Sequence, residues 1–208
     1  MGIFGGTFDP PHVGHLILAG EAVVQLRLSR LLWVLTPVPP HKLDQPITPL
    51  ELRLPMLRHI VEADGDFELS RVEMDRPGPH YAADTIRLLG ERYPSATLVM
   101  VIGGDSLHDL PTWHMAADLV AACHEFGVMR RPGDAIDLAD LESRLPGLGD
   151  KVHFVEAPLL DIASSEIRRR VRQGLPFRYY LTPEVYEYIL ASGLYSDRSA
   201  PPTHPGNG

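Results

Sequence analysis

The sequence predicts an α/β fold in which a doubly wound parallel sheet of five to six strands carries helices on both faces. Short apolar runs alternate with longer amphipathic segments along most of the 208 residues, and this alternation is typical of parallel strands joined by crossover helices. The run TLVMVIG, residues 97–103, is almost entirely apolar, as a central strand buried on both faces should be. The arrangement is Rossmann-like, and ligands are therefore expected beyond the carboxyl ends of the strands.

Apolar runs and helical patterns place the individual elements. Strands are predicted at 2–4, 31–36, 67–70, 97–103, 125–129 and 152–156, and helices at 14–27, 49–62, 81–93, 114–122, 138–144 and 165–173. A last helix over 182–195 has Thr182 as its N-cap, Pro183 at its first position and Gly193 as its terminator. We expect one domain, 1–195, and a disordered tail rich in proline and glycine, 196–208. Because little sequence precedes the first glycines, a native start upstream of Met1 stays open.

Composition and charge narrow the class of protein. The formal net charge is -8, which argues against a general nucleic-acid binder, so any anionic ligand must find a local positive site. No leader sequence and no apolar run of membrane-spanning length are present, which predicts a cytoplasmic protein with no membrane partner. The single cysteine, Cys123, excludes an intramolecular disulfide, and its apolar surroundings predict a core residue.

The segment after the first strand combines groups suited to a phosphate: Gly5, Gly6, Thr7, His12, Gly14 and His15. The glycine pair permits close approach of the backbone, and Thr7 adds a hydroxyl donor. A helix that opens near His12 would direct its first N–H groups and its positive dipole end to the same place. His12 and His15 share one face of its first turn, and Gly14 leaves a flat position for a base.

Other interpretations of this segment are weaker. A tight turn with two surface histidines is the simplest of them, and a zinc site would need a third ligand that stands at no obvious spacing. Neither the dinucleotide fingerprint nor the P-loop spacing is present. The string GGTFDPPHVGH resembles the signature of the nucleotidyltransferase superfamily of α/β phosphodiesterase-like fold, whose T/H-x-G-H element binds ATP.

Two further segments carry hydroxyl and cationic groups. In SSEIRRRVR, residues 164–172, serines and arginines at a helix start suit a polyphosphate, although a capped and solvated basic helix is the alternative. IASSEIR resembles the family's ISSTxIR element, with Ser164, Ser165 and Arg168 matching and Ala163 in place of a serine. In TPVPPHKL, Lys42 is either a solvated loop lysine or, as the resemblance implies, a phosphate contact, with His41 as a weaker neighbour.

Two more segments concern the nucleotide and its acceptor. In IGGDSLHDLPTWH, residues 102–114, Asp105 could accept ribose hydroxyls or cap a helix, and Trp113 could be a core residue or a stacking platform. The segment is similar to bacterial nicotinate mononucleotide adenylyltransferases, which implies an aspartate at the nucleotide site and a tryptophan stacked on the pyridine. In YAADTIRLL, Asp84 or Thr85 lies near a helix start, where it either caps the helix or, by resemblance, helps to hold the nicotinate carboxylate.

The resemblance therefore implies adenylyl transfer from ATP to nicotinate mononucleotide, giving deamido-NAD and pyrophosphate. Its implied catalytic set is Thr7, His15, Lys42 and Arg168, with Mg²⁺ carried by ATP and no metal ligand from protein side chains. Its implied ATP-binding set is Gly5, Gly6, Thr7, His12, Gly14, His15, Lys42, Gly103, Asp105, Ser164, Ser165 and Arg168. Its implied mononucleotide-binding set is Asp84, Thr85, Asp105 and Trp113.

Three alternatives stay open at the level of the sequence. The same chemistry could serve nicotinamide mononucleotide, phosphopantetheine or a cytidylyl-accepting alcohol phosphate. The chain could instead be a nucleotide-sensing module without turnover, although a sensor need not keep His15, Lys42 and Arg168. A hydrolase that uses the histidines with a metal is the third alternative. The oligomeric state, including a homo-oligomer, is also open.

Overall fold

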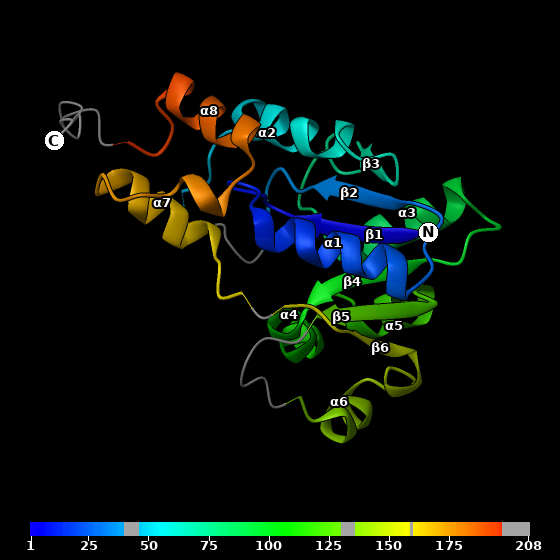
Figure 1. Cartoon of the computed structure of the whole chain (residues 1–208). Coiled ribbons are helices and arrows are strands. Elements are labelled where there is room, and N and C mark those ends of the chain that lie inside the picture. Colours follow the sequence, from blue (N-terminus) through cyan, green and yellow to red (C-terminus); the bar gives the residue numbers. More distant parts are fainter. Residues whose placement is uncertain (40–45, 130–135, 159, 197–208) are drawn as a thin grey trace, which may run out of the picture.

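A single six-stranded parallel sheet forms the centre of the computed structural model, which describes residues 1–39, 46–129, 136–158 and 160–196 (Figure 1). The strand order is β3-β2-β1-β4-β5-β6. The strands are β1 (Gly2–Gly6), β2 (Leu31–Leu35), β3 (Phe67–Ser70), β4 (Val99–Gly103), β5 (Glu125–Met129) and β6 (Val152–Val155). The predicted doubly wound parallel sheet is confirmed.

Helices cover both faces of this sheet. They are α1 (Val13–Gln25), α2 (Leu50–Glu62), α3 (Ala82–Arg92), α4 (Gly104–Asp109), α5 (Ala116–Ala122), α6 (Leu138–Arg144), α7 (Ser164–Arg172) and α8 (Pro183–Ser192). One hydrophobic cluster joins the sheet to α1, α2, α7 and α8, and a second joins its other face to α3, α4, α5 and α6. Neighbouring residues of β1 divide between them, since Phe4 belongs to the first cluster and Ile3 to the second.

The predicted bounds hold for most elements, and the exceptions have local causes. A loop was expected after the strand at 97–103, but α4 begins directly at Gly104, so that prediction is wrong. The helix predicted at 114–122 begins at Ala116, because Met115 has a left-handed conformation with φ of 54°. The last helix has the predicted Thr182 cap, and the predicted terminator Gly193, with φ of 64°, is also confirmed, so the helix ends at Ser192 and does not reach residue 195.

Some predictions concern residues that the structure does not describe. Lys42 and His41 lie outside the described residues, as does the predicted tail apart from Ser196. Cys123 is buried in the core as expected. Within the described part of the chain, the helices are too short or too polar to cross a bilayer.

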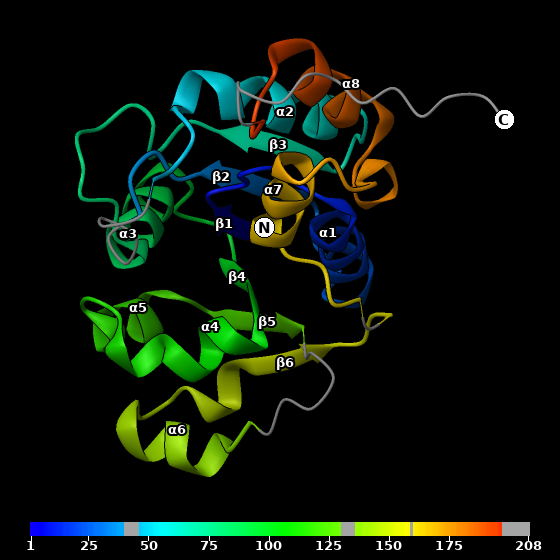
Figure 2. The same ribbon diagram turned by 90° about the vertical axis from the view of Figure 1, so that its left-hand side faces the viewer.

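The sheet reverses its winding between β1 and β4. β1 pairs with β2 along its whole length, from Gly2 to Gly6, but with β4 only at Gly2 and Ile3. The carboxyl ends of β1 and β4 are therefore not hydrogen-bonded to each other. Figure 2 looks toward this edge of the sheet, with α7 beside β1 and α1. In open α/β sheets this switch point is where ligands bind.

Candidate active site

Glycines stand at the two strand ends that flank the switch point. Gly5 and Gly6 end β1, and Gly103 ends β4. A Cβ at Gly5 or at Gly103 would meet no atom within 4 Å, so neither glycine is required by contacts inside the protein. Open space at both strand ends leaves the backbone accessible to a ligand.

The segment between β1 and α1 brings the two predicted histidines together. His12 is the N-cap of α1, and the His12 and His15 rings stack with centroids 3.7 Å apart. The His12 backbone N–H donates to Nδ1 of His15 at 3.1 Å. Because Nδ1 accepts this bond, a neutral His15 carries its proton on Nε2, which is then a hydrogen-bond donor. An edge-to-face contact with Phe8 and a tilted contact with Phe4 hold the His15 ring in place.

The structure explains why residue 14 is a glycine, and the sequence alone did not suggest this explanation. A Cβ at this position would lie 3.1 Å from Nδ1 and 3.2 Å from Cε1 of the His12 ring. A side chain at Gly14 would therefore displace His12, which is only 6% exposed. The glycine allows the stacked histidine pair to form.

The start of α7 contacts the segment after β1, as the phosphate-site prediction requires. The Ser164 hydroxyl donates to the Pro10 carbonyl at 2.8 Å, and Nη1 of Arg168 donates to the Asp9 carbonyl at 2.6 Å. The N-cap of α7 is Ala163, so Ser164 and Ser165 lie inside the first turn rather than before the helix. The expectation that these serines cap the helix is therefore wrong. The Ser164 hydroxyl instead links α7 to the segment after β1. Arg168 thus lies at the same edge of the sheet as His15. One of its guanidinium nitrogens donates to a backbone carbonyl.

A buried carboxylate anchors this segment. Asp9 is 4% exposed, and its Oδ1 accepts a hydrogen bond from the Tyr195 hydroxyl at 2.7 Å. Its Oδ2 accepts the Thr48 N–H at 3.2 Å and lies 3.9 Å from Nη1 of Arg168. Burial, reinforced by Asp9, raises the pKa of Tyr195, so the phenol stays a protonated donor at neutral pH. Residues from three other segments therefore fix the position of Asp9.

Replacing Tyr195 with phenylalanine should lower the free energy of unfolding by about 1.5–3 kcal/mol, because a buried carboxylate oxygen loses its donor. Urea denaturation of the two proteins measures this difference. Tyr179→Phe is the matched control, since Tyr179 is 89% exposed, and it should change stability by less than about 0.5 kcal/mol. Equal stability of the Tyr195→Phe and Tyr179→Phe proteins would show that the Asp9 contact contributes little.

Arg53 connects the loops that follow β1 and β2 through hydrogen bonds to their carbonyl groups. This α2 side chain is 1% exposed. Its Nη1 donates to the carbonyls of Thr7 at 2.7 Å and Thr36 at 3.0 Å. Its Nη2 and Nε donate to the carbonyls of Pro37 at 2.9 Å and Thr48 at 2.7 Å. Burial lowers the pKa of Arg53 and Asp9 opposes this shift, but a guanidinium stays charged at neutral pH. A buried positive charge therefore lies behind the loop that carries Thr7.

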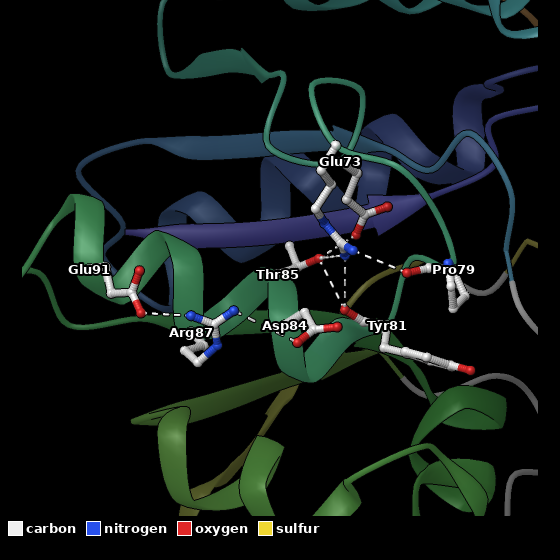
Figure 3. Close-up of polar contacts among 8 residues, drawn as sticks. Glu73, Pro79, Tyr81, Asp84, Thr85, Arg87 and Glu91 are labelled. Carbon is white, nitrogen blue, oxygen red and sulfur yellow. Dashed lines mark hydrogen bonds and ion pairs between the residues drawn. The ribbon is translucent and has the colours of Figure 1, made fainter.

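The start of α3 is built around a second buried carboxyl group. Glu73 is 4% exposed, and its Oε1 accepts the Thr85 hydroxyl at 2.6 Å (Figure 3). Burial raises the pKa of Glu73, against the effect of hydrogen bonds from Thr85 and Thr36. The N-cap of α3 is Tyr81, so the prediction that Asp84 or Thr85 caps this helix is wrong. The Thr85 hydroxyl is a structural donor, and the Asp84 carboxylate lies 3.9 Å from the Arg87 guanidinium.

Aromatic side chains lie between the start of α3 and the segment before α5. The Tyr81 and His114 rings are 4.0 Å apart at 30°. Trp113 is partly buried against the cluster that includes α3 and α5. Asp105 is exposed in the first turn of α4 and is not its N-cap, which is Gly103. The aromatic groups could therefore contact a planar ring near α3.

The structure brings the predicted residues into two groups at one edge of the sheet. The first contains Gly5, Gly6, Thr7, His12, Gly14, His15, Ser164, Ser165 and Arg168, and the second contains Asp84, Thr85 and Trp113. Gly103 and Asp105 lie on the β4 side of the switch point. Among residues 1–39, 46–129, 136–158 and 160–196, no group of three or more His, Cys, Asp or Glu side chains could hold a metal ion.

Several residues of this site were missed from the sequence. Arg53 lies three, four and seven residues before Met56, Leu57 and Ile60, on the core face of α2. An arginine at a core-facing position was therefore an available signal. The roles of Asp9 and Tyr195 depend on a contact between residues 186 positions apart, for which no local signal exists.

Comparison with known proteins finds relatives that match over most of the chain. The family model described as cytidylyltransferase-like matches residues 3–170. A probable nicotinate-nucleotide adenylyltransferase of Thermomicrobium roseum is 47% identical over 94% of this chain and 91% of its own length. The nicotinate-nucleotide adenylyltransferase of Bacillus subtilis is 36% identical over 94% of this chain and 97% of its own length.

A solved structure supports the fold. The nicotinic acid mononucleotide adenylyltransferase of Plasmodium falciparum, complexed with NaAD, superposes with a TM-score of 0.78. Its sequence is 21% identical, and the match covers 93% of this chain and 96% of the other. Together with the high identity to curated relatives, these matches show that the chain belongs to the nicotinate-nucleotide adenylyltransferase family, within the cytidylyltransferase-like proteins.

Proposed function

We propose that this chain transfers the adenylyl group of ATP to the 5′-phosphate of nicotinate mononucleotide, forming deamido-NAD and pyrophosphate. The observation that carries the proposal is the convergence of His15 and Arg168, from opposite ends of the chain, on the segment that follows β1. This segment lies at the switch point of the sheet. The family membership of the chain supports the same reaction.

The reaction requires positioning more than acid–base chemistry. An oxygen of the acceptor phosphate bonds to the α-phosphorus of ATP, the bond from that phosphorus to the bridging oxygen breaks, and pyrophosphate leaves with the electron pair. The acceptor phosphate has its second pKa near 6 and is mostly a dianion at neutral pH, so no general base is needed. Catalysis then depends on holding two anions together and stabilising the charge that develops on the leaving group.

The residues of the first group have distinct proposed roles. Nε2 of His15 donates to a phosphate oxygen, and the Arg168 guanidinium neutralises the polyphosphate. Thr7 and the first N–H groups of α1 add hydrogen-bond donors. The buried charge of Arg53 makes the electrostatic potential behind this loop more positive. Lys42 remains part of the proposed catalytic set on the strength of its sequence motif.

The other members of the proposed ATP site act mainly through shape. Gly5 and Gly103 leave room for the nucleotide, Gly6 leaves room for the Phe8 ring, and Gly14 leaves room for the His12 ring. Ser164 holds α7 against the segment after β1, and Ser165 lies beside it in the first turn of α7. Asp105, exposed next to Gly103, is proposed to accept the ribose hydroxyls.

Nucleotidyltransferases generally use Mg²⁺ with ATP, and Mg²⁺ is commonly held through substrate phosphates and one or two carboxylates. We propose that Mg²⁺ arrives on the triphosphate and takes its ligands mainly from the phosphate oxygens. When bound there, Mg²⁺ neutralises charge on the phosphate oxygens. His15 and Arg168 then orient the triphosphate from the protein side.

For the acceptor, we propose the start of α3 as the site of the nicotinate carboxylate and Trp113 as a stacking partner of the pyridine. In α3 the first N–H with an acceptor inside the helix is that of Thr85, so the preceding amides, up to Asp84, point to an external group. Asp84 would contribute through its backbone N–H, because its carboxylate lies 3.9 Å from the Arg87 guanidinium. Thr85 would contribute by holding the helix start in place, because its N–H donates to the Tyr81 carbonyl and its hydroxyl donates to Glu73.

Replacing Trp113 with alanine should raise KM for nicotinate mononucleotide by about 5- to 150-fold while changing KM for ATP much less, because one aromatic stack is lost. Trp113→Phe keeps a stacking ring and should lie close to the wild type. Steady-state kinetics with each substrate varied in turn measures the effect. Equal increases for both substrates would assign Trp113 to the core alone.

Pyrophosphate release is the assay that tests the reaction. The protein is incubated with ATP and Mg²⁺ alone, and then with nicotinate mononucleotide, nicotinamide mononucleotide or phosphopantetheine. We expect pyrophosphate and a dinucleotide with the nicotinate acceptor. ATP cleavage without an acceptor would indicate a hydrolase, and no turnover with any acceptor would favour a sensor.

The cytoplasmic location, the single domain over 1–195 and the oligomeric state remain proposals.

A further inference from the structure

Arg76 lies at the start of α3, where a cation is normally unfavourable. Its Nη2 is 3.5 Å from the carbonyl of Tyr81, the N-cap, and 3.4 Å from the Thr85 hydroxyl. Its Nη1 donates to the Pro79 carbonyl at 3.0 Å. The N-terminal end of a helix already has a positive potential, so a guanidinium beside it raises the free energy unless an anion binds there.

Few negative charges offset this guanidinium. Within the part of the chain that the structure describes, Arg76 forms no ion pair with a carboxylate. Glu73 shares the Thr85 hydroxyl with Arg76, and burial raises the pKa of Glu73 although the charge of Arg76 opposes this shift. The Asp84 carboxylate is engaged with Arg87 farther along the helix. The positive potential of Arg76 therefore adds to that of α3.

The charge of Arg76 also affects the neighbouring His80. It is 5% exposed, and its pKa is lowered by burial and by the charge of Arg76. Its Nδ1 is buried without a hydrogen-bond partner among the described residues. A buried polar atom of this kind is normally satisfied by a bound water or a ligand.

We infer that Arg76 is a specificity-determining residue that makes the acceptor site favour a pyridine with a negatively charged carboxylate over one with a neutral carboxamide. This inference rests on the proposed function. The guanidinium acts through space and through the Tyr81 and Thr85 contacts that place the helix start. A neutral carboxamide gains nothing from the added potential, whereas a carboxylate gains a charge–charge attraction.

The test compares Arg76→Gln, which keeps hydrogen-bond donors but removes the charge, with Arg76→Lys, which keeps the charge. Arg92→Met, exposed at the far end of α3, is the matched control. For each protein, kcat/KM is measured with the nicotinate and the nicotinamide mononucleotide at saturating ATP. Calorimetric binding of both mononucleotides gives a second ratio that does not depend on turnover.

We expect Arg76→Gln to lower the acid-to-amide preference by about tenfold, mainly through weaker use of the acid. Arg76→Lys and Arg92→Met should keep the preference within about threefold of the wild type. An unchanged preference in Arg76→Gln, or equal losses for both acceptors, would overturn the inference and leave the proposed function intact. A wild-type protein that neither binds nor uses the acid would overturn both.

Discussion

Replacing His15 with alanine is expected to lower kcat by about 10²- to 10⁴-fold, the range of a lost transition-state donor. The structure supplies the reason, because the His12 N–H occupies Nδ1 of His15 and leaves Nε2 as the proton-bearing nitrogen. A donor that acts on the leaving phosphates contributes more in the transition state than in the ground state. The KM values should therefore change less than kcat.

The control for this experiment is His59→Ala, because His59 is exposed in the last turn of α2, outside the proposed site. It should keep kcat within about twofold of the wild type, since substitutions of exposed residues outside a functional site have small effects. Thermal unfolding shows whether loss of the contacts with Phe4 and Phe8 disturbs the fold. Near wild-type turnover of folded His15→Ala would remove His15 from the catalytic set.

Replacing Arg53 with methionine should lower the free energy of unfolding by about 3–5 kcal/mol. The change fills a similar volume but leaves the partly buried carbonyls of Thr7, Thr36, Pro37 and Thr48 without their shared donor. Each unsatisfied buried group costs about 1–3 kcal/mol, and relief of the desolvation of the guanidinium offsets part of that cost. Urea denaturation measures the loss.

Two companion variants make the Arg53 result specific. Arg58→Met, on the exposed side of the same helix, should change stability by less than about 0.5 kcal/mol. Arg53→Lys keeps the charge but cannot reach all four carbonyls, so its stability should fall between those of the wild type and Arg53→Met. If Arg53→Met is as stable as Arg58→Met, the four-carbonyl contact does not hold the loops together.

Local patterns in the sequence predicted the sheet and the histidine pair. Glu125–Met129 has the predicted bounds because its inner residues are apolar and buried, and Phe67–Ser70, an edge strand, has the predicted bounds because its apolar and polar residues alternate. The spacing of His12 and His15 places them one turn apart on a helix, and the rings do stack. Both features depend on residues that are neighbours in the chain.

Features that depend on distant contacts could not be predicted in this way. The hydrogen bond between Tyr195 and Asp9, and the four bonds of Arg53, exist only after the segments have packed. The six-residue helix α4 was missed because the glycines at 103 and 104 favour a loop, whereas the structure begins the helix at Gly104. Tertiary contacts decided each of these cases.

The central claim is that the triphosphate of ATP binds where β1 and β4 separate, between the start of α1 and Arg168 of α7. A crystal structure with a non-hydrolysable ATP analogue and Mg²⁺ tests this claim most directly. We predict phosphate oxygens within hydrogen-bond distance of Nε2 of His15 and of the Arg168 guanidinium. A triphosphate bound elsewhere, with His15 and Arg168 both away from it, would contradict the account.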